Sequence, residues 1–515
     1  MKRQLLTLLF AIVLALCACI PSRTARKKDA ESTPDTVHHE TTQTTIETDE
    51  TSESTTELHV WIIESAYGEL GEFSGISSSG QNFEENYIEN ALKSYARDNY
   101  ISLRIHYSDV VPGDGPMDLL ILGSGADLQY CLSDEKYVDL TPYFEQDQIY
   151  SNGQYVEPVL RAGLQNDQQL TFPLIFNMFA LYTSEESLAR HRLDLSPDAS
   201  FAELVSTFTS ELNNLSRPTD EVLLMGFDSM PALSSVFEFF LFAGGTSLLD
   251  SETETITLDL EYFEKILPLY EAYICNNWDC DRSSLSQLSD NLSVDYRTSD
   301  QSKWYYYSSA ASHSHDSNLV AITDQTACFI DIDSSWNPYQ YSSFIAQAAY
   351  YESRYRDQDE TFMCIGIPEQ QGNSYAARVS LCGLIPTTSK SPDESYKLLK
   401  YLADTPVPWY LGASINRQNI SATMQFLTEA TIELPIYESE PYYMQPMSQE
   451  TATYLTQMID QVHTVYLPLQ TLRMYIEERI LSYLETPTMT PDELYKKIEQ
   501  GISLYLFQEK IGSIH

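Results

Sequence analysis

The chain has 515 residues, of which 43% are hydrophobic and 20% are charged. This length exceeds one ordinary domain and the apolar share can fill a globular core, so two domains or lobes are expected. With 30 Lys and Arg against 74 Asp and Glu, the formal net charge is −44. Such a surface repels phosphate backbones, which argues against nucleic acid as a partner.

Residues 1–18 have the pattern of a secretory signal peptide. Lys2 and Arg3 form a basic start, and an almost continuous apolar run extends from Leu5 to Leu16. The run is too short for a comfortable permanent membrane span. The pattern therefore predicts an exported chain.

A lipidation signal overlaps the end of this segment. Leu16-Cys17-Ala18-Cys19 resembles the bacterial lipobox, in which a small residue precedes the cysteine that becomes the lipidated N-terminus. Cys19 follows the small Ala18, whereas Cys17 follows a bulky Leu, so Cys19 is the predicted lipidation site. An ordinary signal peptide with two incidental cysteines is the alternative. Lipid at Cys19 implies a protein held on the extracytoplasmic face of the cell membrane without spanning it.

Residues 19–57 are predicted to be a disordered tether. From Glu31 to Glu57 the sequence is almost all Thr, Ser, Glu and Asp, with Val37 and Ile46 as its only large apolar residues. It cannot bury enough apolar surface to fold, and its acidic charges keep it extended. His38-His39 is interpreted as part of this spacer rather than as a metal site.

The folded body is expected to begin at Leu58. Leu58 to Ile63 (LHVWII) predicts a strand, and the apolar residues from Phe83 to Ala96 recur at helical spacing. Strict alternation from Ile101 to Tyr107 predicts a half-buried strand, and Asp118 to Leu122 (DLLIL) predicts a buried one. This order indicates an α/β fold with a mainly parallel sheet. Ligands bind at the carboxyl ends of strands in such sheets, so the loops after Ile63 and Leu122 are candidate ligand loops.

Several segments in order resemble the extracellular solute-binding protein family 1, the sugar-type substrate-binding lipoproteins of ABC transporters. They are Asp118 to Asp127 (DLLILGSGAD), Tyr137 to Phe144 (YVDLTPYF), Leu170 to Tyr182 (LTFPLIFNMFALY), Thr326 to Ile330 leading to Trp336, Phe362 to Pro368 (FMCIGIP), Ser380 to Pro386 (SLCGLIP) and the helical segment Pro392 to Leu402. The set covers nearly all of the chain from Leu58 onward. Residues 279–317 lack periodicity and are predicted to be an insertion.

The resemblance implies a two-lobed α/β fold of the type II periplasmic-binding-protein kind, with a ligand cleft between the lobes. Hinge crossings are expected near Phe172-Pro173, Met363 and Thr405-Pro406. Lobe 1 would comprise residues 58–173 and 363–404, and lobe 2 residues 174–362 and 405–515. Closure of such a cleft hides the ligand from water and lets a membrane permease distinguish loaded from empty receptor.

The resemblance also suggests ligand-binding residues. Sugars need flat apolar faces together with polar side chains that reach hydroxyl groups. Trp336 stands at the family's stacking position and is followed by Tyr339, and Asn177 stands where the family places a polar cleft residue. Satisfaction of local backbone is the alternative role for Asn177. Further candidates are Tyr67, Ser124 and Arg378, the last in an expected loop before Val379.

The aromatic neighbours of Asn177 in sequence, Phe176 and Phe179, are possible flanks of this site. The six cysteines after the lipobox show no paired CxxC motif, so no metal site and no cofactor are predicted. Cys275 and Cys280 are close enough in sequence for a disulfide, which stays open. Cys328, Cys364 and Cys382 lie in apolar strand-like runs and are expected to be buried free thiols.

The predicted function is capture of a small polar solute, with carbohydrate as the expected class, and its delivery to the permease subunits of an ABC importer. Nucleophile-elbow, zinc-protease and P-loop motifs are absent from the sequence, so no enzyme is predicted. Two alternatives stay open. A surface-anchored glycan hydrolase needs only two carboxyl groups about 5 to 10 Å apart. A binding module uncoupled from transport has the same sequence features.

Overall fold

Contacts in the computed structural model divide the chain after Thr41, and every residue that the structure describes lies in the second unit, Thr42–His515. The described residues are 42–46, 56–63, 83–108, 111, 115–123, 136–165, 167–191, 194–214, 249–250, 255–256, 261, 264–265, 267, 328–329, 343–370, 372–434, 442–467, 479, 483 and 488–512. The predicted signal peptide, Cys19 and the predicted insertion 279–317 lie outside them. Among the helices described here, none is long and apolar enough to cross a membrane.

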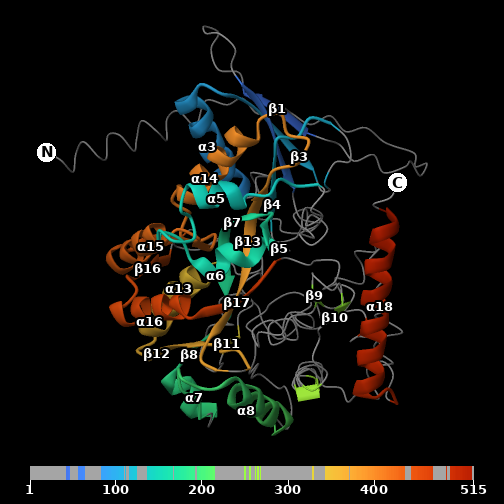
Figure 1. The fold of residues 1–515 in the computed structure, drawn as a ribbon. Coiled ribbons are helices and arrows are strands. Elements are labelled where there is room, and N and C mark those ends of the chain that lie inside the picture. The colour runs from blue at the N-terminus through green and yellow to red at the C-terminus, as the bar shows by residue number, and fades with distance from the viewer. Residues whose placement is uncertain are drawn as a thin grey trace, which may run out of the picture. The chain divides into compact units, whose positions relative to one another are not determined.

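The first elements of the folded body are those that the sequence predicts (Figure 1). They are β2 (Glu57–Ile63), α3 (Phe83–Asn99), β3 (Ser102–Ser108) and β4 (Leu119–Gly123). β2 buries Leu58 and Val60 on one face, and α3 buries Leu92 and Tyr95 one turn apart. The two-residue period of β2 and the helical period of α3 are therefore those of elements that bury one face in the core.

These strands belong to an eight-stranded sheet with the order β1-β3-β2-β4-β13-β7-β14, and β17 also pairs with β13. The other members are β1 (Thr42–Ile46), β7 (Phe172–Met178), β13 (Tyr375–Leu384), β14 (Ala413–Ser414) and β17 (Val462–Tyr466). β2 is parallel to β3 and β4, but β13 is antiparallel to β4 and β7. The α/β class is confirmed, whereas the prediction of a mainly parallel sheet is wrong. The reason is that β13 enters the sheet at the edge where β4 and β7 end.

Strand β1 corrects the prediction that residues 19–57 lack structure throughout. It pairs antiparallel with β3, with Thr42 opposite Tyr107 and Ile46 opposite Leu103. Composition measures only how much apolar surface a segment can bury. Here the open edge of β3 supplies backbone partners, and β-branched Thr and Ile favour extended backbone.

A second sheet has the order β11-β8-β12 and is antiparallel. Its strands are β11 (Cys328–Phe329), β8 (Ala180–Ser184) and β12 (Phe362–Gly366), and α13 (Phe344–Asp357) packs against β8 and β12. The buried Tyr182 hydroxyl donates to the backbone oxygen of Phe344, with 2.9 Å between the oxygens. The chain thus passes from the first sheet to the second between β7 and β8, and returns between β12 and β13. The lobe boundaries given above stay predictions.

The C-terminal helices begin at recognisable capping residues. α14 (Pro392–Asp404) has Pro392 at its start and Asp393 and Glu394 in its first turn, which suits the positive end of the helix dipole. Asn416 caps α15 (Arg417–Glu429), and Ser448 caps α16 (Gln449–Asp460), each by accepting a backbone N–H. α14 contacts α3 and β7, and α16 contacts α13 and α15.

The other described elements are short or lie away from the sheet centre. They are α5 (Thr141–Gln146), α6 (Glu157–Leu160), the 3-10 turn Arg161–Gly163, β5 (Leu164–Gln165), β6 (Gln168–Gln169), α7 (Glu185–His191), α8 (Phe201–Asn214), β9 (Leu249–Asp250), β10 (Thr255–Ile256), β15 (Ile432–Leu434), β16 (Tyr442–Met444) and α18 (Pro491–Gly512).

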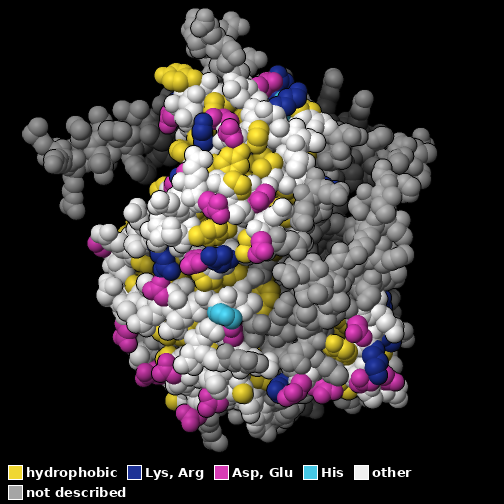
Figure 2. All heavy atoms as spheres, in the orientation of Figure 1, with side chains coloured by type: hydrophobic (Ala, Val, Ile, Leu, Met, Phe, Trp, Pro, Cys, Tyr) yellow, Lys and Arg dark blue, Asp and Glu magenta, His cyan; other side chains and the backbone are white. Residues whose placement is uncertain are grey.

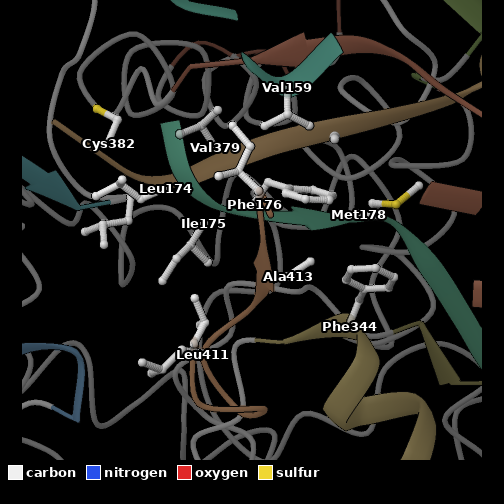
Figure 3. Packing of buried hydrophobic residues seen from close by; sticks show 14 of the residues in the cluster. Val159, Leu174, Ile175, Phe176, Met178, Phe344, Val379, Cys382, Leu411 and Ala413 are labelled. Carbon is white, nitrogen blue, oxygen red and sulfur yellow. The ribbon is translucent and has the colours of Figure 1, made fainter. Parts of the chain in front are cut away.

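The core is centred on β7, whose seven residues are all buried. Figure 3 shows apolar side chains of α6, β7, β13, β14 and α13 gathered in one cluster that contains Phe176. Acidic side chains are spread over the described surface in Figure 2, with scattered Lys and Arg between them. The charge excess thus occupies a solvated surface, as expected from the composition.

Candidate functional site

The candidate site is the sheet edge at which β2, β4 and β7 end. β7 runs in the same direction as β4, because each of them is antiparallel to β13. The register places Gly123, the last residue of β4, opposite Leu381, and Phe176 near the end of β7 opposite Val379. The carboxyl ends of β4 and β7 therefore flank the same part of β13. Ligands of open α/β sheets bind at such an edge.

Asn177 lies at this edge with 1% of its surface exposed. Its Nδ2 donates to Ser380 Oγ of β13 at 2.9 Å, and its Oδ1 accepts from the backbone N of Phe344 at 3.3 Å. Phe344 is the first residue of α13. One side chain thus joins two strands of the first sheet to the helix that packs on the second. These partners are distant in sequence, so the bonds are not those of a locally satisfied loop.

The two bonds use half of the capacity of the Asn177 side chain. An Asn amide has two N–H groups to donate and an oxygen that accepts twice. One of each is engaged by Ser380 and Phe344. These two bonds hold the Asn177 side chain in one orientation. Its role in ligand binding stays a prediction.

Arg378 is placed differently from the expectation. It lies within β13 and opposite Tyr466 of β17, not in a loop before Val379, and is 9% exposed. The expectation was wrong because a charged residue interrupts the apolar run in the sequence. The parallel strand β17 comes from a distant part of the chain and extends the ladder through that residue.

Four of the six predicted ligand residues lie outside the described residues. These are Tyr67, Ser124, Trp336 and Tyr339. The structure does describe the strand ends and the helix start nearest to them in sequence. Ser124 directly follows the end of β4, Tyr67 follows the end of β2, and Trp336 and Tyr339 precede Ser343, the N-cap of α13. The last residue of β4 pairs with Leu381, the neighbour of Ser380, and α13 begins at Phe344, whose backbone N donates to Asn177.

Phe176 and Phe179 are buried at 0% and 5% exposure, so in this structure they are core residues rather than flanks of an open site. Ser380 is a residue that sequence reasoning missed. The available signal was a hydroxyl inside the apolar run Val379 to Leu384, where a buried polar side chain needs a partner.

Glu369 is a second residue that the sequence did not single out. It lies in the return segment between β12 and β13 and is 6% exposed. Its carboxylate accepts from the backbone N of Thr464 at 2.8 Å and from Ser374 Oγ at 2.8 Å, and it faces His463 Nδ1 at 3.2 Å. Glu369 thereby fixes the turn into β13 against β17.

The structure describes three of the six cysteines that follow the predicted lipidation signal. Cys364 and Cys382 are buried free thiols, as predicted. Burial raises the pKa of the Cys364 thiol, which keeps it protonated. Cys328 lies in β11, whereas Cys131, Cys275 and Cys280 lie outside the described residues. Within the described part of the chain, no group of three or more His, Cys, Asp or Glu side chains could hold a metal ion.

One hollow in the described part of the chain lies along α16. Its lining residues are Gln449, Glu450, Thr453, Tyr454 and Gln457. It contains none of the predicted ligand residues.

No family model and no curated protein matches the chain. Solved structures do match it over most of its length. An extracellular solute-binding protein family 1 from Alicyclobacillus acidocaldarius is 9% identical, with 88% of this chain and 100% of that chain covered and a TM-score of 0.48. An ABC substrate-binding protein from Listeria monocytogenes in complex with cycloalternan is 10% identical, with 88% and 99% covered and a TM-score of 0.46.

A sugar transporter protein from Rhizobium etli in an open conformation is also 10% identical, with 87% of this chain and 99% of that chain covered and a TM-score of 0.49.

Proposed function

We propose that this chain is a lipid-anchored solute-binding protein on the extracytoplasmic face of the cell membrane. It captures a small polar solute, with carbohydrate as the proposed class, and delivers it to the permease subunits of an ABC importer. The proposal rests on the ordered motifs from Leu58 onward and on the export and lipidation pattern before them.

The observation that carries the proposal is the way the two sheets are joined. The chain changes sheet at Phe179, between β7 and β8, and returns through the segment after Gly366, between β12 and β13. The backbone N of Ile367 donates to the backbone oxygen of Phe179 at 3.1 Å, so the two connecting segments are bonded to each other. Adjacent segments that link two sheets can supply an axis about which a ligand cleft closes.

The tight packing beside this junction supports the same proposal. The backbone N of Gly366 donates to the hydroxyl of Tyr454 on α16 at 2.8 Å. A Cβ on Gly366 would lie 2.6 Å from Tyr375 Cε1 and 2.7 Å from Met458 Cε. The segment is therefore packed closely against Tyr375 of β13 and Met458 of α16.

A binding screen on the secreted chain tests the proposal. Saccharides, amino acids and polyamines are added to the protein and its thermal unfolding is followed. A ligand at a hundred times its dissociation constant stabilises the folded state by about 2.7 kcal/mol. We expect a stabilising saccharide and a calorimetric stoichiometry of one to one. Stabilisation by amino acids or polyamines alone would contradict the carbohydrate class but leave a solute-binding function.

Two further measurements separate the alternatives. The saccharide is recovered after long incubation and analysed by mass spectrometry, and we expect it unchanged. Cleavage beyond one equivalent, lost on mutation of an acidic residue, would favour the surface-anchored hydrolase. Uptake of the same saccharide is then measured in cells lacking this gene. Normal uptake with intact binding would favour a binding module that is not coupled to transport.

A further inference from the structure

Three aromatic rings stack on the outer half of the eight-stranded sheet. His59 and Trp61 project from the same face of β2, and His106 of β3 is the register partner of Trp61. The ring centroids of Trp61 and His106 are 4.5 Å apart, and those of His59 and His106 are 5.4 Å apart, with the planes nearly parallel. His106 is 5% exposed, so a titratable ring is buried beside the sheet edge.

The two imidazoles are hydrogen-bonded to each other. His59 Nδ1 and His106 Nε2 lie 3.1 Å apart, so one of these nitrogens carries a hydrogen and donates it, and the other accepts the hydrogen bond. His59 Nε2 faces Glu57 Oε2 at 3.7 Å. We assign the proton of His59 to Nε2, toward this carboxylate, and the shared proton to His106 Nε2, because this network satisfies both contacts.

In this assignment His106 Nδ1 carries no hydrogen and has a lone pair that could accept a hydrogen bond. That atom is buried and has no hydrogen-bond partner in the described structure. An added proton has two places to go, and both are unfavourable. A proton added at His106 Nδ1 would form a buried N–H group that has no acceptor. A proton added at His59 Nδ1 would face the N–H of His106 Nε2, so the two donors would repel each other. The alternative is that the His106 proton moves to Nδ1, which again gives a buried N–H without an acceptor.

The positive charges nearby act in the same direction on His106. Arg104, two residues away on β3, is bonded to Glu57 at 2.6 Å and adds positive charge. Asp118, before β4, accepts from the backbone N of His59, the backbone N of Lys390 and the hydroxyl of Ser389. β1 carries no titratable side chain (TQTTI). Burial first, and then the charges of His59 and Arg104, lower the pKa of His106 below its ordinary value.

We propose that the His59–His106 pair is an acid-sensitive lock on the outer edge of the sheet, and that its protonation releases strand β1 from β3. The backbone register places Gln43 of β1 opposite His106 and Thr45 opposite Arg104, so β1 pairs with the part of β3 that carries the lock. The folded form prefers a neutral His106, and the open form takes up a proton. The pairing of β1 with β3 is therefore complete above about pH 6.5, the ordinary pKa of histidine. It is lost as the pH falls from there toward the lowered pKa of His106.

Release of β1 would have one consequence that rests on the proposed function. β1 lies between the proposed lipid anchor Cys19 and β2, so its release lengthens the free chain between membrane and body. The lock itself is independent of that function, since it involves no ligand and no permease.

Hydrogen–deuterium exchange on the full secreted chain tests the lock between pH 7.5 and 5.0, with exchange corrected for the intrinsic effect of pH. We expect the opening of Thr42–Ile46 to rise on acidification by up to about tenfold per pH unit, the slope for uptake of one proton. The peptide covering α14 should show no such slope. His106→Phe keeps a ring against Trp61 but cannot be protonated, and should make the opening of β1 independent of pH.

His463→Phe is the matched control, because His463 also faces a carboxylate but its side chain is 75% exposed and lies on β17. It should keep the wild-type slope. An unchanged slope in His106→Phe, or exchange of β1 that does not respond to pH in the wild type, would overturn the lock.

A second measurement covers the case in which His106→Phe does not fold. In wild-type protein with ring-labelled histidines, NMR should show the His106 proton on Nε2 at neutral pH. It should also show titration of His106 below its ordinary value, together with the loss of β1 protection. A proton on Nδ1 at neutral pH, or titration of His106 without change in β1, would contradict the proposal.

Discussion

Asn177 on β7 accepts a hydrogen bond from the backbone N–H of Phe344, the first residue of α13, across 167 positions of sequence. The same amide donates to Ser380 on β13. A helix start that packs on the second sheet is therefore held by a side chain of the first.

Asn177→Ala is expected to lower the free energy of unfolding by about 1–3 kcal/mol, because it leaves the buried partner groups of Phe344 and Ser380 unpaired. Ser380→Ala should cost less, since it removes one of the two bonds. The double variant should cost less than the sum of the single ones by at least about 0.5 kcal/mol, as expected for contacting residues. Urea unfolding measures all three. Asn152→Ala, at an exposed turn, is the control and should add to Asn177→Ala without coupling. Strict additivity of Asn177→Ala and Ser380→Ala would show that the link carries little energy.

Gly412→Ala is expected to destabilise the pairing of β14 with β7. Gly412 has a φ of +148°, and a Cβ there would lie 2.5 Å from Ile175 Cγ2 and 3.2 Å from the Phe176 oxygen. Backbone strain and a clash then act together, for a loss of more than about 1 kcal/mol. Gly153→Ala is the matched control, because Gly153 has a φ of +69° but nothing within 4 Å of its Cβ position. Melting temperatures should fall further for Gly412→Ala than for Gly153→Ala; equal falls would mean that the clash is relieved.

Stability is expected to fall as the pH rises above about 10, the ordinary tyrosine value. Burial raises the pKa of Tyr150 to about 12, and burial together with Asp393 raises the pKa of Tyr143 to about 12. The folded chain holds protons that the unfolded chain releases, so the stabilisation is present below pH 10 and is lost between pH 10 and 12. Thermal unfolding across this range measures the slope.

Tyr150→Phe should flatten part of that slope, at the cost of the hydrogen bond from Tyr150 to Gln169 at neutral pH. Tyr100→Phe is the control, since Tyr100 is 78% exposed, and it should leave the slope as in the wild type. An equal flattening in both variants would mean that buried tyrosines are not the cause.

Trp336→Ala is expected to weaken binding of the saccharide found in the screen by about 1–3 kcal/mol, through loss of buried aromatic area, with an unchanged melting temperature. Trp409→Ala is the control, because Trp409 packs against the hydrophobic core. It should lower the melting temperature without a comparable loss of affinity. The reverse result, a large fall in melting temperature and unchanged affinity for Trp336→Ala, would make Trp336 a core residue.

Cys19→Ala is expected to release the protein from the membrane fraction into the medium or periplasm, because the acceptor of the lipid is gone. Cell fractionation with detection of the protein measures this. Cys17→Ala is the matched control and should leave the protein membrane-bound. Retention of the Cys19→Ala protein, with lipid on Cys17, would show that the other cysteine is the anchor.

The sequence by itself determined the elements whose hydrophobic period is local and clear. Leu58 to Ile63, the helix behind Phe83 and the alternating strand up to Tyr107 are present as predicted, because burial of one face is written into the spacing of neighbouring residues. That Cys364 and Cys382 are buried and form no disulfide was predicted in the same way, from the apolar runs in which they lie. The α/β class followed from the order of these elements.

Only the tertiary structure decided features that depend on partners far away in the chain. Arg378 is a strand residue because β17 pairs with it, and Thr42–Ile46 is a strand because β3 has an open edge. The partners of Asn177 and the bond between His59 and His106 also join separate elements. No local pattern encodes such pairings, since the energy of a backbone ladder or a buried polar contact comes from whichever group the fold brings within about 3 Å.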